Sequence, residues 1–137
     1  MTHRFRFAAA TAALSLLLTG AAAAMAPRDV LTRYEATART ADAAFTATAA
    51  RGQAFFTARH GNDWTCATCH TANPAAGGRH TVTGKAITPL APSAQPDRLT
   101  DPAKVEKWFG RNCQDVLGRE CTAREKADVV ALLLTIR

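Results

Sequence analysis

Two cysteines and a histidine stand close together near the middle of this 137-residue chain, in the segment Cys66-Ala67-Thr68-Cys69-His70. The spacing Cys-x-x-Cys-His is the pattern by which a polypeptide attaches haem covalently. Two thiols one helical turn apart can both form thioether bonds to the haem vinyl groups, and the histidine that follows can coordinate the iron. The motif therefore predicts one covalent haem c (iron), with Cys66 and Cys69 as attachment points and His70 as the proximal ligand.

Two other kinds of site use part of this pattern. A Cys-x-x-Cys pair can be a thioredoxin-type redox site, but no β-α-β pattern surrounds Cys66 and Cys69. Such a pair can also be half of a zinc site, but no second pair and no suitably spaced pair of histidines accompanies it. Haem attachment is therefore the interpretation that the residues favour.

The N-terminal segment has the pattern of a secretory signal. Arg4 and Arg6 precede an apolar run that ends in small residues, which predicts a signal peptide over residues 1–26, cut after about Ala24 or Ala26. The alternative is an uncleaved membrane anchor. It is disfavoured because the run is barely long enough to span a bilayer and consists mostly of alanine.

The remaining chain, residues 27–137, is long enough for one domain, a monohaem cytochrome c domain. Export by a cleaved signal predicts a periplasmic protein, in a compartment where disulfides can form. The net charge of the whole chain is +6, but no dense patch of lysine and arginine with interleaved aromatics occurs, so we expect no nucleic-acid partner. A solvated surface with a mild preference for acidic partners is the simpler interpretation of the charge.

Apolar periodicity and capping residues predict a small all-α fold without strand pairs. The glycines and prolines between residues 73 and 100 predict a long irregular loop, which is unusual unless a cofactor organises it. Gly52 should let its helix cross the last helix closely, near Leu132 or Leu133. Besides the haem motif, we expect helices over residues 28–39, 49–59 and 101–109, and Gly110 should end the helix over 101–109. A last helix is expected to begin at the capping box formed by Thr122 and Glu125.

The residues alone leave the sixth coordination position of the iron open. The only methionines, Met1 and Met25, lie in the signal region, so the methionine ligand common in small haem proteins is excluded unless cleavage precedes Met25 and the extreme N-terminus reaches the haem. His60 and His80 are candidates, although each is more ordinary as a surface histidine. The other options are a vacant position, water, or a weak oxygen or nitrogen donor from the segment after the long loop.

Several segments in the second half of the chain carry a family resemblance. They are Thr83-Gly84-Lys85, Pro89-Leu90-Ala91-Pro92-Ser93, Pro96-Asp97-Arg98, Val105-Glu106-Lys107-Trp108 and Gly110-Arg111-Asn112-Cys113. With them the chain resembles the sphaeroides haem protein family, small class I-like cytochromes c with an unusual distal ligand; the match is loose between Thr37 and Asp63. The resemblance implies a class I-like cytochrome c fold wrapped around one covalent haem.

The resemblance also implies roles for three residues. From the residues alone, Asn112 would be a turn asparagine after a helix that ends at Gly110, but the family places its sixth iron ligand at this position. Cys113 and Cys121 are implied to form a disulfide, which we expect to hold the chain beside Asn112. A dihaem cytochrome c and a membrane b-type cytochrome are implied as redox partners.

The roles that the resemblance implies lead to an expected function. An amide is a weak, neutral donor that should suit ferric iron better than ferrous iron, so reduction should loosen Asn112 and open the sixth position to O₂, NO or CO. We therefore expect a carrier of single electrons that also binds a diatomic gas. The alternative is a gas-binding or O₂- or NO-handling haem protein in which electron transfer is secondary. No catalytic residue stands out, so an electron-transfer role is favoured over an enzymatic one.

Two smaller predictions concern the surroundings of the haem. The carbonyl of Pro89, or else of Pro92, is expected to accept a hydrogen bond from the His70 ring. Trp64 and Trp108 are expected to form walls of the haem pocket.

Overall fold

The structure is a computed structural model that describes residues 25–137, so nearly all of the predicted signal segment 1–26 lies outside the described residues. The described part is mainly helical, as predicted, with one very short pair of strands. The elements in chain order are α1 (Pro27–Arg39), α2 (Ala49–Thr57), α3 (Cys66–His70), β1 (Gly78–Arg79), β2 (Ala86–Ile87), α4 (Pro102–Leu117) and α5 (Ala123–Thr135). Within residues 25–137, no helix has the length and apolar character needed to cross a bilayer.

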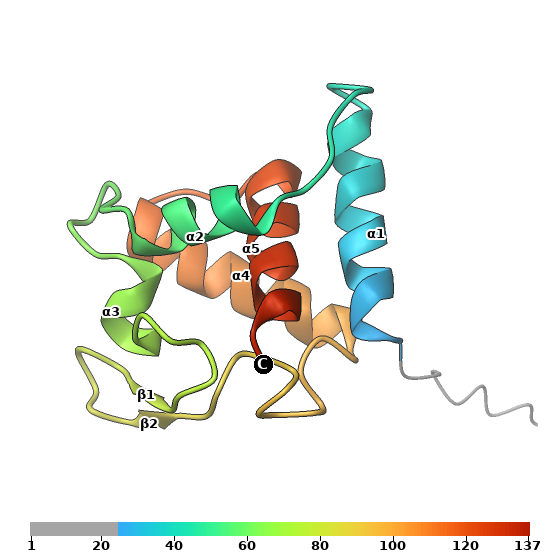
Figure 1. The fold of residues 1–137 in the computed structure, drawn as a ribbon. Helices are drawn as coiled ribbons and strands as arrows, with labels where there is room; N and C mark the ends of the chain where they lie inside the picture. Colours follow the sequence, from blue (N-terminus) through green and yellow to red (C-terminus); the bar gives the residue numbers. More distant parts are fainter. Residues whose placement is uncertain (1–24) are drawn as a thin grey trace, which may run out of the picture.

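Helix α5 is the centre of the hydrophobic core. Its capping box is the predicted one, with the Thr122 side chain accepting from the Glu125 amide and the Glu125 side chain accepting from the Thr122 amide. Helices α1 and α2 both pack against α5, while α3 and the strand pair lie on the side of the molecule away from α1 (Figure 1). The core is built from buried apolar side chains of these three helices, among them Val30, Tyr34, Phe56, Val130, Leu132 and Leu133.

The close crossing of α2 and α5 depends on Gly52. A Cβ atom at Gly52 would overlap the backbone carbonyl of Asp128 and would lie 3.0 Å from the Cβ of Leu132, so no larger residue fits here without a shift of the helices. The prediction that Gly52 allows a close crossing near Leu132 is confirmed. The buried Asp128 side chain fixes the same junction, because it accepts hydrogen bonds from the Thr48 amide (2.7 Å) and from Arg51 Nε (2.8 Å).

The prediction that the helix expected over residues 101–109 ends at Phe109 is wrong. Helix α4 begins after the N-cap Asp101, continues through Gly110 and ends at Leu117, where Gly118 takes a left-handed conformation with a φ of 72°. Gly118, and not Gly110, therefore supplies the glycine that ends the helix. A glycine inside a helix costs about 1 kcal/mol relative to alanine, which good caps at both ends can offset. Asn112 consequently lies within a helix and not in a turn.

The prediction of no strand pair is also wrong, within an otherwise irregular loop. β1 and β2 are antiparallel, with Gly78 opposite Ile87 and Arg79 opposite Ala86. Local hydrogen bonds close this hairpin, because His80 Nδ1 accepts from two amides of the connecting turn. Such short strands leave no alternating pattern in the sequence, since their pairing depends on the turn chemistry between them.

Candidate haem site

The haem motif forms a one-turn helix with a firm start. The side chain of Thr65, the N-cap of α3, accepts from the Thr68 amide (2.9 Å), and the Thr68 hydroxyl accepts in return from the Thr65 amide (3.0 Å). The helix ends where Thr71 takes a φ of 62°, directly after His70. Cys66, Cys69 and His70 are thus held on one short helical turn, as the spacing requires.

A cavity of about 330 Å³ brings the predicted site residues together. Cys66, Cys69 and His70 line it from α3, and Asn112 lines it from α4. The rest of the wall is mostly apolar and includes both tryptophans, as predicted; the aromatic members are Phe55, Phe56, Trp64, Trp108 and Phe109. The volume is in the range of small-molecule and cofactor sites.

The residues that line the cavity fit a haem. A flat macrocycle needs a largely apolar slot, two thiols on one side of it and an axial nitrogen donor, and the cavity offers all three. The backbone after the motif is also shaped for close packing. A Cβ at Gly78 would overlap the carbonyl oxygen of Cys69, so the hairpin lies directly against the attachment turn. Sequence reasoning missed Gly78; the adjacent glycines at 77 and 78, soon after the motif, were the available signal.

The electrostatics of the attachment turn favour metal ligation over thiol redox chemistry. Burial, with smaller contributions from the charges of Arg98 and His80, lowers the pKa of His70 to about 4 in the chain without haem. The imidazole is therefore neutral at pH 7 and has a lone pair for a metal ion. Burial raises the pKa of the Cys66 thiol to about 11. A thioredoxin-type pair needs a thiolate of lowered pKa, so this environment disfavours that alternative.

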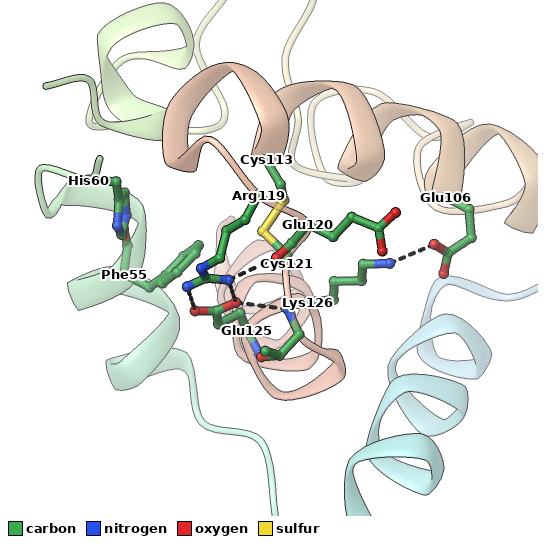
Figure 2. The surroundings of a disulfide bond; sticks show 10 residues. Phe55, His60, Glu106, Cys113, Arg119, Glu120, Cys121, Glu125 and Lys126 are labelled. Carbon is green, nitrogen blue, oxygen red and sulfur yellow. Dashed lines mark hydrogen bonds and ion pairs between the residues drawn. A yellow bond between two sulfur atoms is a disulfide. The ribbon is translucent and has the colours of Figure 1, made fainter. Parts of the chain in front are cut away.

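Asn112 lies next to the disulfide between α4 and the start of α5. Cys113 and Cys121 are bonded, with their Cα atoms 5.6 Å apart (Figure 2). Beside the disulfide, the Arg119 guanidinium donates to both carboxylate oxygens of Glu125, at 2.9 and 2.7 Å. The segment that follows Asn112 in the chain is thus fastened covalently and by an ion pair.

The other two histidine candidates have local partners. His60 Nε2 is 2.9 Å from the carbonyl oxygen of Phe55, and the two rings lie in contact at a tilt of 46°, with centroids 4.6 Å apart. His80 lines the cavity, but its Nδ1 is occupied by the amides of Val82 and Thr83. Both histidines therefore have structural roles that account for their presence.

The structure does not contain the predicted hydrogen bond from the His70 ring to the Pro89 carbonyl. Arg98 Nε donates to that carbonyl (2.7 Å), and Arg98 Nη2 donates to the carbonyl of Thr88 (3.0 Å). Arg98 lines the cavity and at the same time ties down the loop that leads to α4. The several donors of a guanidinium explain this role, and no local sequence pattern indicates it.

Comparison with known proteins shows that the chain is similar to cytochromes over most of its length. A family model described as a domain of unknown function (DUF1924) matches residues 42–133. Cytochrome c-type protein SHP from Cereibacter sphaeroides is 48% identical over 126 residues, which cover 88% of this chain and 93% of that protein.

Two solved structures extend the similarity to the fold. The structure of oxidised SHP, described as an oxygen-binding cytochrome c, superposes with a TM-score of 0.70 at 46% identity over 80% of this chain and 96% of that one. The solution structure of cytochrome c'' from Methylophilus methylotrophus, whose description concerns haem-ligand detachment, has a TM-score of 0.71 at 38% identity. The superposition covers 80% of this chain and 92% of the cytochrome c'' chain.

Proposed function

The chain belongs to the DUF1924 family and to the family of cytochrome c-type protein SHP, and from this membership we propose that Asn112 is a detachable sixth ligand in a carrier of single electrons. Its cofactor is one covalently attached haem c, as in SHP and cytochrome c''. In this proposal Cys66 and Cys69 attach the haem, His70 is the proximal ligand, and reduction releases Asn112 so that O₂, NO or CO can bind.

The observation that carries the proposal is that Asn112 lines the same cavity as His70 from a different helix. When bound, the haem would supply an iron that can exchange one electron and take a diatomic ligand. An amide oxygen is a hard, neutral donor, so Asn112 favours ferric over ferrous iron. Two relatives agree with a detachable ligand and a gas, since one is described as oxygen-binding and the other by haem-ligand detachment.

A second candidate function is gas binding or O₂ or NO handling as the main purpose, with electron transfer secondary. The observation that favours it is the description of the related SHP structure as an oxygen-binding cytochrome c. The two candidate functions use the same site. They differ in whether electron transfer or gas binding is the main role of the protein in the cell.

We also propose the partners and the compartment in which this function takes place. Residues 1–26 have the pattern of a signal peptide, and the disulfide between Cys113 and Cys121 suits an oxidising compartment such as the periplasm. The redox partners in this proposal are the two that the resemblance implies, a dihaem cytochrome c and a membrane b-type cytochrome.

Absorption spectra of the wild type and of Asn112→Ala test the proposal. In the mutant the ferric spectrum is expected to change because the sixth ligand is gone, while the ferrous spectrum and its response to CO stay as in the wild type. Gln114→Ala is the matched control, because this exposed amide lies on the same helix and does not line the cavity. An Asn112→Ala ferric spectrum identical to that of the wild type would show that another group holds the sixth position.

A further inference from the structure

One face of α4 is basic and exposed. Lys104, Lys107, Trp108 and Arg111 are spaced by three and four residues, so they share one side of the helix. All four are exposed in the chain without haem. We call these four residues the basic face of α4.

The basic face lies where the haem cavity meets the solvent. Lys104 and Trp108 line the cavity and are also exposed, so this side of α4 forms part of its rim. Lys107 and Arg111 do not line the cavity. Their charges are therefore presented outside the cavity.

The positive charges of this face have no intramolecular partners among residues 25–137. The ion pairs of the described chain engage other cations, such as Lys126, which holds Glu106 at 2.7 Å. The Arg111 guanidinium instead lies over the Trp108 ring, 5.6 Å from its centroid. Arginine and tryptophan are both enriched at the centres of protein interfaces.

Carboxylates lie at the two ends of the face and not within it. Asp101 accepts from the Lys104 amide (3.1 Å) as the cap of the helix. Asp115 lies one turn beyond Arg111, where the basic stretch ends. The face is therefore locally positive, and its charge is limited to the two turns beside the cavity rim.

We infer that the basic face of α4 is the docking surface for an acidic redox protein, with Trp108 at the centre of the contact. This inference rests on the proposed function, because it gives the site at which electrons enter. Carboxylates around the partner's cofactor would meet Lys104, Lys107 and Arg111, which steers the encounter, and contact at Trp108 would bring the two cofactors close.

The experiment uses reduced flavodoxin, a small acidic electron carrier, as the probe and follows reduction of the ferric holoprotein by stopped flow. Lys107→Glu is the test variant, because Lys107 is exposed and does not line the cavity. Arg28→Glu on α1 is the matched control: it makes the same change of net charge at another exposed site, and no residue of α1 lines the cavity. Free reduced riboflavin serves as a reductant without a protein surface.

At low salt, Lys107→Glu is expected to lower the rate constant with flavodoxin by roughly threefold to tenfold and to flatten its salt dependence, whereas Arg28→Glu has a much smaller effect. Oxidised flavodoxin should shift the amide signals of residues 104–111 in NMR spectra and leave those of α1 in place. Equal effects of the two variants, or shifts elsewhere, would overturn the inference.

Two further outcomes are informative. Binding through this face to vesicles of phosphatidylglycerol and phosphatidylcholine, without any response to flavodoxin, would overturn the inference in favour of a membrane surface. Reduction by riboflavin tests the proposed function separately: normal reduction with failed docking leaves that function standing, and no reduction at all removes it.

Discussion

At the scale of single residues, the proposed role of Asn112 is the most unusual, because a carboxamide is a weak ligand for iron. The attachment motif is readable from the sequence since two thioether bonds and a proximal ligand require neighbouring residues, here Cys66, Cys69 and His70. The ligand on the other face of the haem has no such local requirement. Only the family resemblance pointed to Asn112, which lies on a distant helix and lines the cavity in the fold.

The first residue-scale prediction concerns the disulfide beside Asn112. In Cys113→Ser/Cys121→Ser, loss of the closed loop should lower the free energy of unfolding by about 2.5 kcal/mol on chain-entropy grounds. The affinity of the ferric protein for added imidazole should rise, because a less constrained Asn112 competes less well for the iron. Denaturant unfolding and imidazole titration measure the two effects.

Thr122→Ala provides the control for this prediction. Removing the N-cap of α5 should cost about 1 kcal/mol while the disulfide remains, so stability falls and imidazole affinity stays unchanged. If the double serine variant also binds imidazole as the wild type does, the disulfide stabilises the fold but does not control Asn112.

The second residue-scale prediction concerns pH. The Arg119 guanidinium holds the pKa of Glu125 below its ordinary value of 4.5. The ion pair therefore contributes stability above about pH 4.5, and this contribution is lost as the pH falls through the lowered pKa. Glu125→Gln keeps the capping hydrogen bond but removes the charge. Its deficit in unfolding free energy relative to the wild type should be present at pH 7 and shrink in acid; a deficit independent of pH would contradict this assignment.

At the scale of elements, the sequence predicted where the helices begin better than where they end. Starts carry side-chain signals, such as Asp101 before Pro102 and the capping box at Thr122. The end of α4 was misplaced because Gly110 resembles a terminator, and choosing between Gly110 and Gly118 requires the backbone conformation of each. The hairpin of β1 and β2 was missed because its two-residue strands are fixed by the turn between them.

Two glycine substitutions test these helix assignments. At Gly110 an added Cβ has open space and α4 continues, so Gly110→Ala should raise the free energy of unfolding by about 0.5–1 kcal/mol. At Gly52 the added Cβ overlaps the Asp128 carbonyl, so Gly52→Ala should lower it by about 1–3 kcal/mol. Thermal or denaturant unfolding of the holoprotein gives both values. Destabilisation by Gly110→Ala would mean that α4 does not run through this position.

At the scale of the whole molecule, the chain has a packed side and a side built around the cofactor. Helices α1, α2 and α5 form a hydrophobic core that their periodicity predicted. The other side, with α3, the loop and α4, surrounds the cavity and is held by particular contacts such as those of Arg98. The glycines and prolines of the long loop predicted that a cofactor organises it. The side-chain contacts that hold the loop in place depend on the tertiary structure, so no periodic pattern in the sequence reveals them.

The central claim is that reduction frees the sixth position of the iron. Mixing of the dithionite-reduced wild type with increasing concentrations of CO, followed by stopped-flow absorption, tests it most directly. If Asn112 has already left the ferrous iron, the observed rate rises in proportion to the CO concentration without a limit set by the protein. A rate that reaches a plateau, set by a ligand that must first dissociate, would contradict the account.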